Sequence, residues 1–240
     1  MSQVISDLQV QGRTWQQVAI ALDYSLFKPE ANRDQIIQLS EEAVGFGFAA
    51  VSVNPCWISL VASILHGTPV KVSTTIGFPL GASHTSVKRF EAEEAVRLGA
   101  QELEMVMNIG ALKSGDRTLV QTEIESVAAI AHNGGAIVKV ILETPLLTLE
   151  EKILSCQLCL AARADFVKTA TGFMGTATTD DIALMRGVVG DQAGVKASGG
   201  IRTAAQVNAM LDAGADRIGT STAVAIMQEL GAAEKIQIRL

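Results

Sequence analysis

Three lysines occupy positions where an apolar chain would be expected. Lys139, Lys168 and Lys196 each lie in a short apolar run with the composition of a buried strand. An isolated buried ammonium costs several kcal/mol, so lysines on such strands need a partner or a function. The chemistry that uses a buried lysine is Schiff-base formation, in which the neutral amine attacks a carbonyl carbon.

Such a reaction requires a lysine with a lowered pKa. At the ordinary pKa of about 10.4, only a few parts in ten thousand of a lysine are neutral at pH 7. A second ammonium about 5 Å away, at an effective dielectric of about 20, repels by roughly 3 kcal/mol and lowers the pKa by about two units. Partial burial adds to this shift. We therefore expect Lys168 to be the nucleophile and Lys196 the neighbouring cation, with Glu104 or Asp23 moving protons through a bound water.

A structural interpretation of the same residues is also open. In it, the three lysines form ion pairs with the carboxylates Asp23, Glu104 and Glu143. For any one lysine the two interpretations are about equally supported. Three lysines at one face of the protein favour function.

Glycines and small hydroxyl residues follow three of the predicted strands. The loops are Lys168-Thr-Ala-Thr-Gly172, Ser198-Gly-Gly-Ile201 and Gly219-Thr-Ser221. Backbone N–H groups exposed in such loops bind phosphate, although each loop alone could be a tight turn. Three converging loops predict a phosphate site.

The elements that would position these residues alternate between strand and helix. Eight strands are predicted at residues 18–22, 49–53, 70–76, 102–107, 137–142, 165–168, 194–197 and 216–219, with an amphipathic helix after each. Strands that are apolar throughout indicate a parallel sheet covered by helices. With 240 residues, the chain is predicted to be a single (β/α)8 barrel domain over 1–240. The first 14 or so residues are predicted to add an N-terminal helix.

Composition excludes several classes of protein. The net charge is -6 and no basic cluster occurs, which argues against nucleic acid as a partner. No apolar stretch is long enough to span a membrane, and no secretion signal is evident, so a cytoplasmic location is expected. Cys156 and Cys159 fall within a helical pattern and are predicted to be buried structural thiols. The three histidines show no metal-ligand spacing, so neither a metal nor another cofactor is expected.

The sequence resembles the deoxyribose-phosphate aldolase family of class I aldolases. The resemblance runs from about Leu22 to Ala225. Eight segments carry it in order: 22–29, 51–55, 75–81, Glu102-Leu-Glu-Met-Val-Met-Asn-Ile-Gly110, Lys139-Val-Ile-Leu-Glu-Thr144, Asp165-Phe-Val-Lys-Thr-Ala-Thr-Gly-Phe173, Val195-Lys-Ala-Ser-Gly-Gly-Ile201 and 217–221.

The resemblance implies a (β/α)8 barrel and a metal-free reaction in deoxyribonucleotide and carbohydrate catabolism. The family reversibly cleaves 2-deoxy-D-ribose 5-phosphate to D-glyceraldehyde 3-phosphate and acetaldehyde. It further implies Lys168 as the Schiff-base lysine, Lys196 as its partner and Glu104 as the proton shuttle, supported by Asp23 and Lys139. The phosphate would lie on Gly172, Gly199, Gly200, Gly219 and Ser221. The family is commonly dimeric, which predicts a homodimer.

The sequence departs from the family pattern at the proton shuttle. Glu104 stands where the family usually has Asp, and a displacement of about 1 Å can cost on the order of 100-fold in rate. Ala170, Ser52 and the pair Tyr24-Ser25 also differ from the common residues. The C-terminal tyrosine that some members use has no counterpart here, because Tyr24 is the only tyrosine.

Three hypotheses follow. The first is an active aldolase for deoxyribose 5-phosphate. The second keeps the pocket but changes the substrate to a related phosphosugar or a longer aldehyde. The third is a catalytically weakened or silent barrel that binds a phosphorylated metabolite because of Glu104, which Glu104→Asp would then reactivate.

Overall fold

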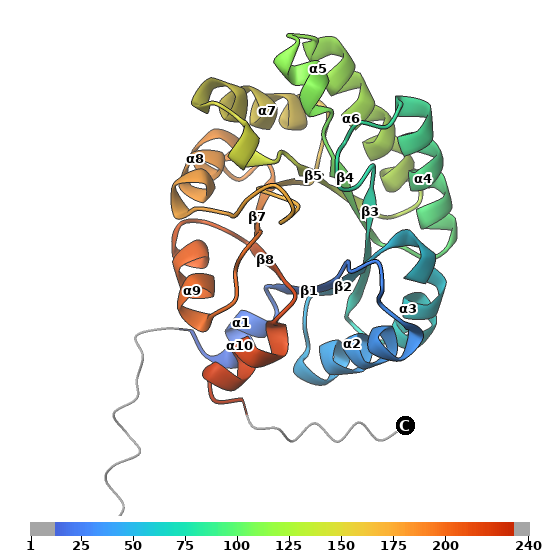
Figure 1. Ribbon diagram of the computed structural model, residues 1–240, viewed down its shortest axis with the longest axis vertical. Helices are drawn as coiled ribbons and strands as arrows, with labels where there is room; N and C mark the ends of the chain where they lie inside the picture. The colour runs from blue at the N-terminus through green and yellow to red at the C-terminus, as the bar shows by residue number, and fades with distance from the viewer. Residues whose placement is uncertain (1–12, 233–240) are drawn as a thin grey trace, which may run out of the picture.

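The strands close into a parallel barrel. The computed structural model describes residues 13–232, and in them each strand pairs with the next while β8 pairs with β1. Figure 1 shows helices surrounding this barrel on its outside. The strands are β1 Leu22–Leu26, β2 Ala50–Val53, β3 Lys71–Ile76, β4 Glu102–Val106, β5 Ile137–Ile141, β6 Phe166–Lys168, β7 Gly194–Ser198 and β8 Arg217–Thr220. The predicted (β/α)8 barrel is confirmed.

The helices begin at side chains that cap their first N–H groups. Asn32, Thr148 and Thr203 each form a capping box with a residue three positions later. The helices are α1 Trp15–Ala19, α2 Arg33–Phe46, α3 Ile58–Leu65, α4 Thr85–Arg97, α5 Ile109–Lys113, α6 Arg117–Asn133, α7 Leu149–Ala161, α8 Thr179–Val189, α9 Ala204–Asp212 and α10 Ala223–Glu229, with short 3-10 turns η1 Pro55–Trp57 and η2 Thr144–Leu146. None of the helices in this described part has the length and apolarity that crossing a membrane needs.

The predicted position of the first strand was wrong. Residues 18–22 were expected to form it, but Val18 lies in α1 and β1 begins at Leu22. Thr14 caps α1 in a capping box with Gln17, and the apolar run that follows fits a buried helix as well as a strand. Asp23 therefore lies inside β1 and not after it. The helix predicted for the first 14 residues lies largely outside the described residues, although α1 does precede the barrel.

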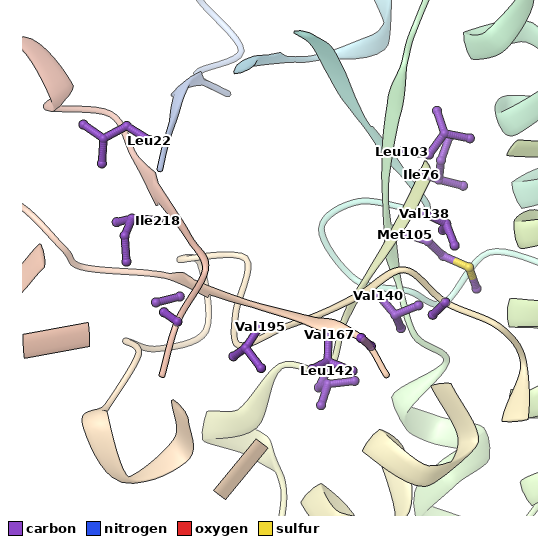
Figure 2. Close-up of a cluster of buried hydrophobic side chains, with 14 of the residues drawn as sticks. Leu22, Ile76, Leu103, Met105, Val138, Val140, Leu142, Val167, Val195 and Ile218 are labelled. Carbon is purple, nitrogen blue, oxygen red and sulfur yellow. The ribbon is translucent and has the colours of Figure 1, made fainter. Parts of the chain in front are cut away.

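Apolar side chains fill the space between the barrel and the helices. Alternate strand residues point outward, and Figure 2 shows Val138, Val140, Val167 and Val195 among those directed away from the barrel axis. The inward-facing positions of β4 to β7 include five charged groups, all buried: Glu102, Glu104, Lys139, Lys168 and Lys196. Barrel interiors are usually filled by branched aliphatic residues, so ions at these positions mark the interior as the functional region.

A second buried ion pair lies outside the barrel, between α4 and α6. The Lys88 ammonium donates to the Glu123 carboxylate at 2.7 Å and to the Val106 carbonyl at 3.0 Å. The two side chains are 0% and 1% exposed. Because Val106 ends β4, this pair supports the strand that carries Glu104.

We expect this pair to stabilise the fold only as a pair. Glu123→Leu leaves a buried ammonium and should destabilise by about 3 kcal/mol, whereas the double variant Lys88→Met/Glu123→Leu should recover most of that loss. Urea unfolding measures both, and Glu94→Gln, which breaks the exposed pair with Arg97, should change little. A double variant as unstable as the single one would contradict this expectation.

Candidate active site

Neighbouring strands bring the three predicted lysines together. Lys168 on β6 lies directly opposite Lys196 on β7, and Lys139 on β5 lies opposite Phe166, two residues before Lys168. Residues two apart on a strand face the same side, so all three side chains point into the barrel. Each lysine is at most 1% exposed.

Glu104 contacts both the predicted nucleophile, Lys168, and the predicted neighbouring cation, Lys196. Its Oε2 accepts a hydrogen bond from the Lys168 Nζ at 2.6 Å, while its Oε1 accepts one from the Lys196 Nζ. Ser52, at 3.5 Å, donates to the same carboxylate. Because Glu104 touches the amine directly, its carboxylate can exchange a proton with Lys168 without the intervening water that was expected.

The network continues to the other side of the barrel. Lys196 also donates to Asp23, and Lys139 donates to Asp23 at 2.8 Å and to Glu102 at 2.5 Å. Arg217 on β8 donates through its Nε to Asp23 at 2.8 Å. Glu102 and Arg217 were assigned no site role from the sequence. Their spacing in the sequence could have revealed them, because residues two apart on a strand face the same side. Glu102 precedes Glu104 by two residues, and Arg217 precedes Gly219 by two.

The charges in this network do not balance when every group is ionised. Four cations, from three lysines and Arg217, face the three carboxylates of Asp23, Glu102 and Glu104. One surplus positive charge in a buried site favours loss of one proton. Removing it from a lysine leaves the network neutral.

Lys168 is the group most easily deprotonated. Burial is the largest cause that lowers the pKa of Lys168, and the neighbouring ammoniums of Lys196 and Lys139 act in the same direction. Glu104 opposes them, and the net result is a pKa of about 8. About a tenth of Lys168 is then neutral at pH 7. The prediction of a lowered pKa for Lys168 is confirmed. From the sequence, the neighbouring ammonium was expected to be the main cause and burial an addition, but burial has the larger effect on this pKa.

Lys196 and Glu104 stay charged. Burial alone lowers the pKa of Lys196, but Asp23 and Glu104 outweigh it and hold that pKa above its ordinary value. Burial likewise raises the pKa of Glu104, yet the three lysines hold it well below its usual range. Lys196 is therefore an ammonium and Glu104 a carboxylate at neutral pH.

Glu143 does not pair with the lysines, and the interpretation that included it was wrong on this point. Its carboxylate accepts the N–H of Thr171 at 3.2 and 3.3 Å, and no ion pair to it is found among residues 13–232. Its backbone is left-handed, with φ 59° and ψ 57°, which costs about 1 kcal/mol for a residue with a Cβ. This conformation turns the side chain toward the loop after β6.

The five predicted phosphate-binding residues share one cavity at the barrel mouth. It has a volume of about 300 Å³ and is lined by Gly172, Gly199, Gly200, Gly219 and Ser221. Gly172 and Gly199 have φ of +89° and +108°, a conformation that other residues rarely adopt. Lys28 and Arg202 also line this cavity and were missed. They lie in the loops after β1 and β7, and their positive charges suit an anionic ligand.

Three aromatic side chains meet beside this cavity. The Phe78 ring lies 5.1 Å from that of Phe27 and 5.5 Å from that of Phe173, centroid to centroid. They come from the loops after β3, β1 and β6. Phe27 and Phe173 line the cavity, so an apolar edge borders the predicted phosphate site.

The remaining predictions place residues away from the site. Cys156 and Cys159 are buried in α7, and burial raises the pKa of Cys156 to about 12, which confirms structural thiols. His132 pairs with Asp165 at 2.9 Å, before the start of β6. His66 and His84 cap α3 and α4.

The fold and the site together define a class of protein. A parallel (β/α)8 barrel with a low-pKa lysine at the carboxyl end of a strand is suited to Schiff-base chemistry on a carbonyl compound. A family model described as DeoC/LacD family aldolase matches residues 7–229. The chain belongs to this aldolase family.

Individual relatives agree with this assignment. A protein of Thermoanaerobacter sp. (strain X514), named deoxyribose-phosphate aldolase, is 53% identical over 88% of this chain and 96% of its own. One from Thermococcus gammatolerans with the same name is 53% identical over 88% and 95%. The solved tetrameric deoxyribose phosphate aldolase from Aeropyrum pernix superposes with a TM-score of 0.85 at 32% identity, covering 91% of this chain and 93% of that one.

Proposed function

We propose that this aldolase reversibly cleaves 2-deoxy-D-ribose 5-phosphate to D-glyceraldehyde 3-phosphate and acetaldehyde. The observation that carries the proposal is Lys168, whose amine has a lowered pKa, contacts Glu104 and lies opposite Lys196. The names of the relatives supply the substrate. The cavity lined by the glycine loops suits the phosphate end of that sugar.

The neutral Lys168 amine attacks C1 of the open-chain sugar, and loss of water leaves an iminium on that nitrogen. Glu104 takes the proton of the C3 hydroxyl. The C2–C3 bond then breaks, its electron pair forms the enamine on C2, and C3 leaves as the aldehyde of glyceraldehyde 3-phosphate. Protonation of C2 and addition of water release acetaldehyde and restore the amine.

The remaining charged groups maintain the charge states and positions of Lys168 and Glu104. Lys196 stays an ammonium that favours the neutral form of Lys168 and stabilises ionised Glu104. Asp23 accepts a hydrogen bond from Lys196, and Lys139 and Arg217 hold Asp23 in place by donating to the same carboxylate. Gly172, Gly199, Gly200, Gly219 and Ser221 bind the phosphate.

Glu104 in place of aspartate does not separate the carboxylate from the lysines. Its oxygens reach both Lys168 and Lys196, so the longer side chain fits this site. The relatives named deoxyribose-phosphate aldolase do not favour the silent barrel. The preference for another phosphosugar or a longer aldehyde stays a hypothesis for a substrate panel.

The wider setting is also proposed. A homodimer stays a prediction, supported by exposed Val87 and Phe90 on the outer helix α4. A cytoplasmic location is supported by three free cysteines. The single-domain organisation over 1–240 and the independence from cofactors stay predictions.

Borohydride trapping tests the proposed reaction directly. Reduction in the presence of deoxyribose 5-phosphate should leave a stable adduct on one lysine, and peptide mapping should place it on Lys168. An adduct on Lys196 would exchange the roles of the two lysines. No adduct on a folded protein would return the silent phosphosugar-binding barrel as the better hypothesis.

A further inference from the structure

Glu143 is a buried carboxylate that the reaction does not use. It is 0% exposed, its backbone is left-handed, and no cation pairs with it in residues 13–232. A buried carboxyl group without a cationic partner and a strained backbone each disfavour folding, and such features persist where they serve a site. These features indicate that Glu143 has a function at a nearby site.

The contacts of Glu143 lead to the predicted phosphate loop. Both its carboxylate oxygens accept the N–H of Thr171. The Thr171 hydroxyl in turn accepts the N–H of Phe173 at 3.1 Å. Next to Glu143, the Thr144 N–H donates to the Thr169 carbonyl at 2.9 Å. The end of β5 thus holds the loop after Lys168 by side chain and backbone.

This arrangement selects one N–H group for the ligand. Of the three successive N–H groups in the loop, those of Thr171 and Phe173 already have acceptors. The N–H of Gly172 has none among the described residues, and Gly172 lines the cavity. The left-handed Gly172, with φ of +89°, depends on the orientation of the Thr171 peptide that precedes it.

We propose that Glu143 is a positioning residue that orients the Thr171–Gly172 peptide for the phosphate group of the substrate. The proposal rests on the function proposed above, because it assigns the cavity to a sugar phosphate. Glu143 acts through the loop and not on the reacting atoms. Removing its carboxylate should therefore weaken phosphate binding and leave the chemistry at Lys168 intact.

Three substitutions separate this role from a purely structural one. Glu143→Gly removes the acceptor and relieves the left-handed backbone, so it should keep or raise the thermal unfolding temperature while raising KM for deoxyribose 5-phosphate about tenfold. Glu143→Asn also tolerates this backbone but is one methylene shorter, and should raise KM likewise. Glu143→Gln keeps an oxygen at the same reach and should stay within about twofold of the parent.

Two readouts isolate the phosphate end. For 2-deoxyribose without phosphate, all three variants should retain the parental kcat/KM, because the loop then has no anion to bind. Calorimetric binding of inorganic phosphate should weaken about tenfold in Glu143→Gly, and this measurement needs no turnover. Arg163→Gly is the matched control, because exposed Arg163 has the same φ of 59° but lies away from the site. It should change neither the KM for deoxyribose 5-phosphate nor the affinity for inorganic phosphate.

The outcomes distinguish the two proposals. If the parent cleaves deoxyribose 5-phosphate but Glu143→Gly and Glu143→Asn keep its KM, Glu143 does not position the loop. Equal losses for the phosphorylated and unphosphorylated sugars, or loss of folding in both variants, would overturn the role as well. If the parent binds phosphate through this loop but cleaves neither sugar, the proposed function fails and the role of Glu143 stands on the binding data.

Discussion

Lys168→Leu is expected to abolish cleavage of deoxyribose 5-phosphate, with a loss of more than about a thousandfold in kcat. The amine of Lys168 forms the covalent intermediate in the proposed reaction, and it is the amine that donates to Glu104 Oε2 at 2.6 Å. Steady-state assays and borohydride trapping measure the loss of turnover and of the adduct together.

The fold should survive this substitution. Three cations then face three carboxylates, so the buried network is left without surplus charge. Circular dichroism and thermal unfolding check this point. The inactivity is then chemical and not a consequence of unfolding.

Two controls sharpen the result. Lys168→Arg keeps a positive charge beside Glu104 but offers no neutral amine, so it should be as inactive as Lys168→Leu. Lys152→Leu makes the same substitution in a partly buried pair with Asp181 on the outer helices, and it should keep parental activity. Ordinary turnover in Lys168→Leu would overturn the assignment of the nucleophile.

The meeting of the lysines could be predicted because it depends on two regular periods. Lys168 and Lys196 lie at matching positions of consecutive strands in a parallel barrel, and strand residues alternate between interior and exterior. The shared cavity of the five predicted phosphate-binding residues follows from the same topology, since all lie at or shortly after the carboxyl ends of β6, β7 and β8. These are local patterns repeated by the fold.

The errors arose where a long-range contact decided the outcome. Residues 18–22 fit a helix or a strand by pattern, and packing of Val18 and Ala19 against the core decided for α1. Glu143 was assigned to the lysines because its spacing from Lys139 places both on one strand face. Its left-handed backbone breaks that alternation, and no sequence period reveals such a turn at a residue with a Cβ.

Glu102 and Arg217 were missed for a related reason. Each lies at the start of its strand, where barrel positions usually serve stability and not chemistry. Their contacts with Lys139 and Asp23 join neighbouring strands whose residues lie 37 and 194 positions apart in the sequence. A count of charges on inward-facing strand positions would have found them.

Lys196→Leu is expected to move the pH dependence of cleavage toward alkaline pH. Only neutral Lys168 is active, so the rate rises as pH passes through the pKa of Lys168. Removing the Lys196 ammonium removes one cause that lowers this pKa, and it leaves Glu104 free to stabilise the protonated form of Lys168. A rise of roughly one to two units would lower the rate at pH 7 by about 10- to 100-fold and restore part of it near pH 10.

The same substitution should weaken the fold, with a pH dependence of definite sign. Burial raises the pKa values of Asp23 and Glu104, but the lysines outweigh it and hold both pKa values below the ordinary range. The stability they contribute is therefore present above pH of about 4 and lost as pH falls further. Lys196 donates to both of these carboxylates, whereas Lys168 donates to Glu104 alone. We therefore expect Lys196→Leu to lose about 3 kcal/mol at neutral pH, more than Lys168→Leu, as measured by urea unfolding.

Lys196→Arg separates the charge from the lysine itself. Arginine keeps a cation beside Glu104 and Asp23, so the pH midpoint of cleavage should stay near that of the parent even if packing against Gly219 lowers the rate. Gly219 leaves the space that the Lys196 side chain occupies, which limits how a larger group can fit. If Lys196→Leu keeps the parental midpoint, burial alone sets the pKa of Lys168, and Lys196 serves proton transfer or folding instead.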